Sequence, residues 1–205
     1  MRRTDKKRLM PPTIGIFGGT FDPPHLGHLA VADAAHAAFG LDSLLVIPAA
    51  HAPLRDDPPR ASDPDRLAMV ALAFADRPWA RVDAREMRRG GTSWSIDTAR
   101  ELAAEHAGVR LIWILGSDQL LRLDRWKDVA ELCRLVEFAV LARDGLGAEP
   151  PASLRGLARV IPLRQPESPW SSTLIREALR SSARSRNGLP PAVAALIEER
   201  GLYRD

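Results

Sequence analysis

The sequence predicts a single α/β domain in which helices cover both faces of a doubly wound parallel sheet. Short apolar runs alternate along the chain with longer segments of helical periodicity, which is typical of successive strand–helix units. One run, Val109–Leu115, is the most apolar of the predicted strands, as expected of a central strand that is buried on both faces. The 205 residues are enough for one substantial core and short for two domains.

The first strand–helix unit begins with a short apolar strand from Ile14 and continues through a turn at Gly18 and Gly19. Glycines allow a tight turn whose backbone amides are not shielded by side chains. Two prolines that cannot lie inside a helix follow, so we expect the helix to begin beyond them, over Leu26–Phe39, and to end at Gly40. Because unpaired amides and the helix dipole both favour negative charge, this unit predicts an anion-binding cradle.

Two histidines, His25 and His28, lie at the start of this helix. They are three residues apart, so their side chains share one face, where they can donate hydrogen bonds to a phosphate. The alternatives are a metal site or a purely structural pair, but no third metal ligand is evident nearby beyond Asp22. We therefore expect phosphate binding and no metal ion held by the protein.

The following segment predicts two strands that flank a capped helix. The apolar run Ser43–Pro48 indicates a second buried strand, and the weak alternation of Trp79–Asp83 indicates a third. Between them, Ser62 begins a helix as its N-cap, with an acidic residue three positions further on. The face of this helix that we expect in the core consists of Leu67, Val70, Ala71 and Phe74. We expect a turn over Glu86–Gly91 before the next helix.

That next helix and the central strand bring polar residues to the carboxyl edge of the sheet. We expect the helix over Ser95–Ala107, with Ser93 or Ser95 as its N-cap. The central strand then leads into Gly116 and Asp118. Ligands of open parallel sheets gather at the carboxyl ends of the strands, so Asp118 is a candidate to accept hydrogen bonds from ribose hydroxyls. A helix N-cap is the alternative role for this residue.

The last part of the chain predicts two more strand–helix units. We expect a helix over Asp128–Leu135, strands over Val136–Ala142 and Arg159–Leu163, and a final helix over Pro190–Arg200. The single cysteine, Cys133, is expected to be a buried structural thiol. One cysteine excludes a disulfide framework.

A second anion site is predicted near the C-terminal end. Ser171–Thr173 follow a proline and form the expected start of a helix, with their hydroxyls beside unpaired amides. Arg176 lies in the first turn, where a cation opposes the helix dipole by roughly 0.3–1 kcal/mol. A bound polyphosphate reverses the sign of this effect, because amides, hydroxyls and the guanidinium then hold it together. A helix start with a solvated arginine is the alternative.

The basic residues are concentrated at the N-terminus. Residues 1–9 contain five basic residues and one acidic residue, a net charge of +4, so the remainder carries −1 within the chain's total of +3. We therefore predict a disordered basic tail over residues 1–12, one domain over residues 13–205, and no nucleic-acid partner. No apolar run has membrane-spanning length and no secretion signal is evident, so we expect a cytoplasmic protein without a membrane partner. The sequence is compatible with a homo-oligomer.

Several of these motifs together resemble a known family. Residues 18–28, Gly-Gly-Thr-Phe-Asp-Pro-Pro-His-Leu-Gly-His, are similar to the GGTFDPxHxGH signature of nucleotidyltransferases with an HxGH motif, most of all the bacterial nicotinate-nucleotide adenylyltransferases. Residues 93–98 resemble that family's Ser-Tyr-Thr-x-Asp-Thr segment, residues 116–120 its GxDxL motif, and residues 170–176 its ISSTxIR motif. The chain departs from the family at Leu54, where the pattern has histidine.

The resemblance implies a role for each matching residue. For catalysis, it implies His25, His28 and Arg176. For ATP binding, it implies Gly18, Gly19, Thr20, Phe21, Gly116, Asp118, Ser172 and Thr173. For nicotinate mononucleotide binding, it implies Arg55, Ser93, Trp94, Ser95, Trp126 and Arg143. In this family, the tryptophan that Trp126 matches stacks on the pyridine ring. The alternative for Trp126 is burial in the core.

The implied fold is a Rossmann-like nucleotidyltransferase fold. The implied reaction joins ATP and nicotinate mononucleotide to give deamido-NAD and pyrophosphate, with Mg²⁺ carried mainly by the ATP phosphates. Three alternatives are a phosphopantetheine adenylyltransferase, a related enzyme for nicotinamide mononucleotide, and a nucleotide-binding sensor or tRNA-binding relative without turnover. The match over residues 93–98 weighs against the first, and the intact histidine pair and near-neutral body weigh against the last.

Overall fold

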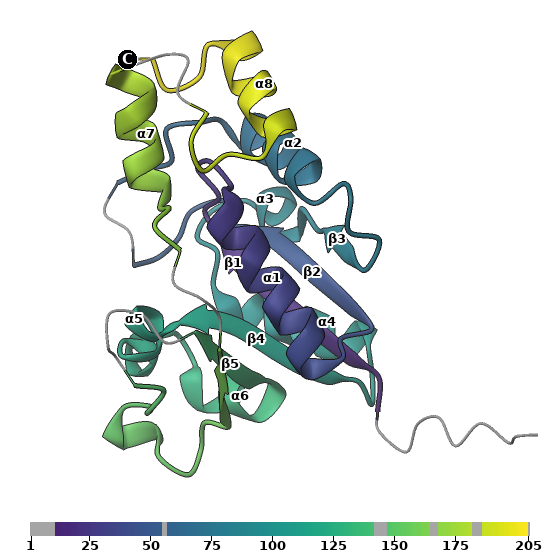
Figure 1. The fold of residues 1–205 in the computed structure, drawn as a ribbon. Helices are drawn as coiled ribbons and strands as arrows, with labels where there is room; N and C mark the ends of the chain where they lie inside the picture. The colour runs from purple at the N-terminus through teal and green to yellow at the C-terminus, as the bar shows by residue number, and fades with distance from the viewer. Residues whose placement is uncertain (1–10, 55–56, 142–146, 165–167, 182–185, 205) are drawn as a thin grey trace, which may run out of the picture.

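The computed structural model describes residues 11–54, 57–141, 147–164, 168–181 and 186–204. Its centre is a six-stranded parallel sheet with the strand order β3-β2-β1-β4-β5-β6 (Figure 1). The chain moves outward from β1 in one direction, returns to place β4 beside β1, and then moves outward in the other direction. This is the doubly wound arrangement that the sequence predicts.

The elements alternate along the whole chain. The strands are β1 (Thr13–Gly19), β2 (Ser43–Pro48), β3 (Ala80–Val82), β4 (Arg110–Gly116), β5 (Glu137–Leu141) and β6 (Val160–Leu163). The α-helices are α1 (Leu26–Phe39), α2 (Asp63–Ala73), α3 (Arg85–Arg89), α4 (Ser95–Glu105), α5 (Ser117–Leu120), α6 (Val129–Leu135), α7 (Ser172–Ser181) and α8 (Pro191–Arg200). Short 3₁₀ turns lie at Leu123–Arg125 and Ala152–Leu154. Within the described ranges, no helix has the length and apolar character that crossing a membrane requires.

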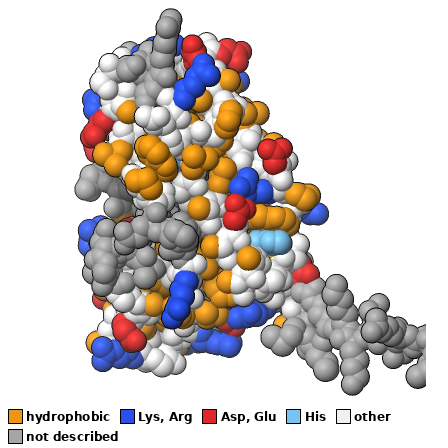
Figure 2. Space-filling view, viewed as in Figure 1, with side chains coloured by type: hydrophobic (Ala, Val, Ile, Leu, Met, Phe, Trp, Pro, Cys, Tyr) orange, Lys and Arg blue, Asp and Glu red, His pale blue; other side chains and the backbone are white. Residues whose placement is uncertain are grey.

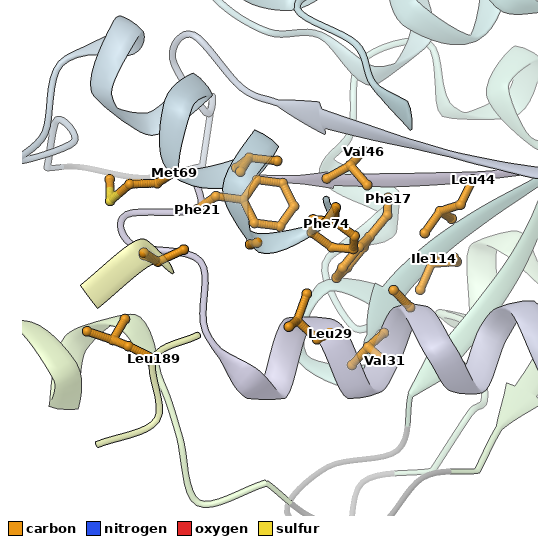
Figure 3. Close-up of a cluster of buried hydrophobic side chains, with 14 of the residues drawn as sticks. Phe17, Phe21, Leu29, Val31, Leu44, Val46, Met69, Phe74, Ile114 and Leu189 are labelled. Carbon is orange, nitrogen blue, oxygen red and sulfur yellow. The ribbon is translucent and has the colours of Figure 1, made fainter. Parts of the chain in front are cut away.

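Each face of the sheet has its own hydrophobic core. Side chains of α1, α2, α7 and α8 pack with one face, as Figure 3 shows in part. Side chains of α4, α5 and α6 pack with the other face. Successive strand residues point to opposite faces, so Phe17 and Ile114 belong to the first core while Ile16 and Trp113 belong to the second. The central strands are therefore covered on both sides, as predicted from their apolar sequences.

Local signals fix the limits of the first two helices. Helix α1 has the predicted bounds and ends at Gly40, whose φ of 57° places it in the left-handed region that glycine favours. Ser62 is the N-cap of α2, and its Oγ accepts a hydrogen bond from the Asp65 amide at 3.3 Å. Cys133 is buried, as predicted. These three predictions are confirmed.

The segment before α4 differs from the prediction. The turn expected over Glu86–Gly91 is helix α3, which buries Glu86 where its Oε1 accepts a hydrogen bond from the Thr98 hydroxyl at 2.7 Å. Neither serine caps α4, because the N-cap position belongs to Trp94 and has no side-chain hydrogen bond. Ser93 instead accepts a hydrogen bond from the Ala50 amide at 2.9 Å. Ser93 therefore makes a long-range hydrogen bond instead of capping α4.

Helix α2 turns a different face to the core from the one predicted. Its buried residues are Arg66, Met69, Val70 and Ala73. Of the predicted face, Val70 and Phe74 are buried, Leu67 is half-buried and Ala71 is exposed. The cause is Arg66, which is fully buried although arginine is seldom found inside proteins.

The Arg66 guanidinium joins two loops that follow neighbouring strands. Its Nη1 donates to the carbonyl oxygen of Thr20, just after β1, at 2.7 Å. Its Nη2 donates to the carbonyl oxygen of Ala50, just after β2, at 3.4 Å, and to Asp63 Oδ1 at 2.6 Å. The charge is therefore paired, and two backbone acceptors obtain partners inside the protein.

Charged side chains of both signs share the molecular surface. On the face seen in Figure 2, lysine and arginine side chains are interspersed with aspartate and glutamate.

Residues 1–10, which make up most of the predicted basic tail, lie outside the described residues. The domain boundary after residue 12 therefore stays a prediction.

We expect Arg66→Met to lower the free energy of unfolding by about 2–4 kcal/mol, because it leaves the Thr20 and Ala50 carbonyls without their donor. Urea unfolding followed by circular dichroism measures this change. The control is Arg77→Met, which removes a surface arginine paired with Asp33 and should cost less than about 1 kcal/mol. Equal losses in the two variants would contradict the expectation that the buried bridge contributes more to stability than the surface pair.

Candidate active site

A cavity of about 300 Å³ lies at the carboxyl edge of the sheet. Its walls include the ends of β1 and β4, the segment after β2, and the start of α4. Strands β1 and β4 are neighbours whose following chain segments lead to opposite sides of the sheet. Such a switch point is where open α/β sheets bind their ligands.

The two histidines pack together at one wall of this cavity. His28 lines it, whereas His25 is only 4% exposed and lies behind, with the ring centroids 3.8 Å apart. The backbone amide of His25 donates to Nδ1 of His28 at 3.1 Å. Because Nδ1 accepts, a neutral His28 carries its proton on Nε2 and can donate it. Phe21 supports the ring edge-on at 4.9 Å and is itself buried in the core.

Glycine at two signature positions allows close packing around the histidines. A Cβ at Gly27 would lie 2.7 Å from Ser168 Oγ and 2.9 Å from the His25 ring. A Cβ at Gly19 would lie 3.2 Å from the Phe21 ring. Side chains at these positions would therefore displace the groups that hold the histidine pair.

Tryptophan side chains form the opposite part of the cavity wall. Trp126 is half-buried, packs edge-on against Trp113 at a centroid distance of 6.3 Å, and still lines the cavity. Its Nε1 is buried without a hydrogen-bond partner among the described residues. Trp94 also lines the cavity, and Nζ of Lys127 lies 5.3 Å from the centroid of the Trp94 ring. The site therefore offers aromatic surface together with a cation.

Polar groups at the start of α4 complete this wall. Ser93 and Ser95 both line the cavity, and Ser93 is anchored to the segment after β2. Glu86 also lines the cavity although it is largely buried, and burial raises the pKa of its carboxyl. On the other side, Asp118 lines the cavity but does not cap α5, whose N-cap is Gly116. The carboxylate of Asp118 is exposed and available to hydroxyl donors.

A second cavity of about 330 Å³ adjoins the first, because Thr20 and Leu54 line both. Thr173 and Arg176 of α7 lie in its wall. Nη1 of Arg176 donates to the backbone oxygen of Asp22 at 2.7 Å, which ties α7 to the signature loop. This cavity offers a guanidinium and hydroxyls, the donors that suit a polyphosphate.

The predicted residues fall into three groups. The first cavity is lined by Gly18, Gly19, Thr20, His28, Ser93, Trp94, Ser95, Gly116, Asp118 and Trp126, and the second by Thr20, Thr173 and Arg176. Phe21 and His25 are buried behind the first cavity, and the Ser172 hydroxyl donates to the Pro23 carbonyl at 2.9 Å. Arg55 and Arg143 lie outside the described residues.

Sequence reasoning missed several residues of this region. Glu86, Trp113 and Arg125 line the first cavity. Three others act through their contacts: Arg66, which joins the loops after β1 and β2; Lys127, which faces Trp94; and Tyr203, whose hydroxyl contacts Asp22. Lys127 directly follows Trp126, so its place beside the cavity could have been expected. The partners of Arg66 and Tyr203 are distant in sequence, and no local signal predicts them.

Comparison of the sequence with known families agrees with this geometry. Residues 16–178 match the family model described as cytidylyltransferase-like. The chain is 38% identical over 196 residues to a Bordetella pertussis protein named "Probable nicotinate-nucleotide adenylyltransferase", with 93% of this chain and 98% of that protein covered. A protein of the same name from Bordetella petrii is 42% identical over 196 residues, with the same coverage.

Solved structures share the fold. The Plasmodium falciparum nicotinic acid mononucleotide adenylyltransferase complexed with NaAD has a TM-score of 0.75 at 17% identity, covering 94% of this chain and 97% of that one. A Vibrio parahaemolyticus structure described as a putative nicotinate-nucleotide adenylyltransferase has a TM-score of 0.64 at 18% identity, covering 95% and 96%. The fold, the family model and relatives matched over nearly their full length agree: this chain belongs to the cytidylyltransferase-like family and, within it, to the nicotinate-nucleotide adenylyltransferases.

Proposed function

We propose that the chain transfers the adenylyl group of ATP to nicotinate mononucleotide, which gives deamido-NAD and pyrophosphate in a step of NAD biosynthesis. The observation that carries this proposal is the pair of adjoining cavities, with His28 in the wall of one and Arg176 in the wall of the other. The names of the relatives and the NaAD complex of the Plasmodium falciparum enzyme support it.

In this proposal, ATP extends across both cavities. Its α-phosphate lies beside His28, and its β- and γ-phosphates extend past Thr20 toward Thr173 and Arg176. The support is that Thr20 lines both cavities and that the wall of the second one includes Arg60 and Arg176 beside Asp22 and Asp57. Asp118 faces the ribose hydroxyls as an acceptor. Ser172 then positions α7 rather than binding phosphate, since its hydroxyl already donates to Pro23.

Nicotinate mononucleotide occupies the aromatic part of the first cavity. The pyridine ring stacks on Trp126, and the backbone amides at the start of α4 face its acid group. The support is that Trp126, Ser93, Trp94 and Ser95 line the same cavity. Arg55 and Arg143 remain the predicted contacts of the 5′-phosphate.

The reaction needs no nucleophile from the protein. An oxygen of the acceptor's 5′-phosphate forms a bond to the α-phosphorus while the bond from that phosphorus to the pyrophosphate oxygen breaks. The protein positions the two anions and stabilises the charge that develops on the α-phosphate. The Nε2 proton of His28 is suited to this task because Nδ1 is held as an acceptor.

Mg²⁺ is the cation that we expect to accompany ATP. Within the described residues, no three or more His, Cys, Asp or Glu side chains come together as a metal site. The cation would therefore take its ligands mainly from phosphate oxygens and water, which is usual for Mg²⁺ with nucleotides. When bound, it neutralises part of the phosphate charge.

We expect His28→Ala and His25→Ala each to lower kcat by at least about 10²-fold, the scale for losing one transition-state donor. His28 supplies the donor, and the tilted His25 ring packs against it with a centroid distance of 3.8 Å. Pyrophosphate release at saturating ATP and nicotinate mononucleotide measures the effect. The control is His36→Ala on the same helix, where the imidazole stacks on Trp79 away from the cavity and kcat should stay within about twofold. Near-normal kcat in either signature variant contradicts its catalytic role.

We expect the enzyme to prefer nicotinate mononucleotide over nicotinamide mononucleotide by roughly 10²-fold or more in kcat/KM. Amides at the start of α4 can only donate, and a carboxylate can only accept, so the acid satisfies them and the helix dipole adds attraction. A carboxamide would turn its NH₂ group toward a donor and leave one group unpaired, at a cost of about 1–3 kcal/mol. Measuring kcat/KM for both mononucleotides with ATP tests this.

Two variants separate backbone from side-chain recognition. Ser95→Ala should reduce the preference only modestly, because the amides remain, whereas Trp126→Ala should weaken both mononucleotides alike. Equal kcat/KM values for the acid and the amide in the wild-type enzyme would contradict the proposed selectivity.

A further inference from the structure

The C-terminal segment contacts the signature loop through one side chain. Tyr203 follows α8, and its ring packs against the first hydrophobic core. Its hydroxyl donates a hydrogen bond to Oδ1 of Asp22 at 2.7 Å, although the two residues are 181 positions apart. The reaction described above gives this tyrosine no role.

Asp22 is 3% exposed, so its carboxylate must find partners within the protein. Oδ1 accepts a hydrogen bond from the Ala61 amide at 3.0 Å as well as from Tyr203, and Oδ2 accepts one from the Arg60 amide at 2.8 Å. Nη1 of Arg176 lies 4.0 Å from Oδ2, which is an ion pair at the limit of its range and too long for a hydrogen bond. That nitrogen donates to the backbone oxygen of Asp22 instead.

This arrangement creates a competition for the Arg176 guanidinium. A buried carboxylate that lacks donors gains most from a bidentate arginine, and such a pair would occupy the guanidinium donors that a ligand of the cavity needs. Arg176 also lines the second cavity, where the proposed polyphosphate needs it. The uncharged groups that donate hydrogen bonds to the Asp22 carboxylate decide this competition. Each of these hydrogen bonds reduces the free energy that the carboxylate would gain by pairing with the arginine.

We propose that Tyr203 is a positioning residue: its hydrogen bond to Asp22 keeps that carboxylate from capturing Arg176 and so leaves Arg176 facing the second cavity. The inference rests on the proposed function, since it takes ATP as the ligand of that cavity. Burial, followed by the nearby charge of Asp22, raises the pKa of Tyr203 above its ordinary value. The hydroxyl therefore stays protonated and remains a donor at neutral pH.

The variant Tyr203→Phe removes the donor and keeps the ring. We expect it to lower kcat/KM for ATP about 10-fold and to leave KM for nicotinate mononucleotide within about twofold. In an Arg176→Gln background, the same tyrosine substitution should change kcat/KM for ATP less than about twofold, because the group through which it acts is already gone. Titration calorimetry with ATP on the same four proteins provides a second measurement.

The outcomes separate positioning from general weakening of the fold. Arg204→Ala is the matched control: its Nη2 donates to the Glu198 carbonyl, so it loosens the same segment without touching Asp22, and ATP kinetics should not change. Equal losses from Tyr203→Phe in both backgrounds, or no loss in either, would overturn the inference. Turnover by the wild-type enzyme tests the proposed function separately. If the wild-type enzyme shows no turnover, the ATP affinities of the four proteins measured by calorimetry still decide the role of Tyr203.

Discussion

The buried guanidinium of Arg66 is the interaction on which the site geometry depends. Burying an arginine is costly unless its charge is paired, and here Asp63 pairs it while Nη1 and Nη2 donate to the Thr20 and Ala50 carbonyls, although Nε has no hydrogen-bond partner among the described residues. Those carbonyls belong to the segments that follow β1 and β2, and these segments form part of the wall of the first cavity. A single side chain of α2 therefore sets the distance between two loops that are not adjacent in the sequence.

Asp22 provides a matching constraint of opposite charge. Its carboxylate joins the signature loop to residues 60–61 and to the C-terminal segment, just as Arg66 joins the loops on the other side. Thr20 lies between the two, lining both cavities while its carbonyl is held by Arg66. The signature loop is thus held by a buried cation and a buried anion, and its Gly18, Gly19 and Thr20 line the first cavity.

Sequence reasoning succeeded where the signal was local. The bounds of α1 follow from two prolines and Gly40, and the cap of α2 follows from Ser62, because these residues act within one helical turn. The glycine loop, His28 and Arg176, which the structure places in the cavity walls, were predicted from local signals of the same kind. The predicted core face of α2 was correct for Val70 and Phe74 and wrong for Ala71, because hydrophobic periodicity cannot anticipate a buried arginine. Ser93 and Tyr203 have partners 43 and 181 residues away, and only the folded chain brings such pairs together.

The direction of β1 has a practical consequence for attaching probes to the molecule. In a parallel sheet, every strand begins at the same edge, and Thr13 at the start of β1 lies at the edge opposite the cavities (Figure 1). The Thr13 amide is anchored there by Asp42 Oδ2 at 2.7 Å. A fluorophore or a surface linker joined ahead of Thr13 would therefore be attached on the side of the molecule opposite the cavities. An immobilised layer oriented in this way would present its ligand-binding openings to the flowing solution.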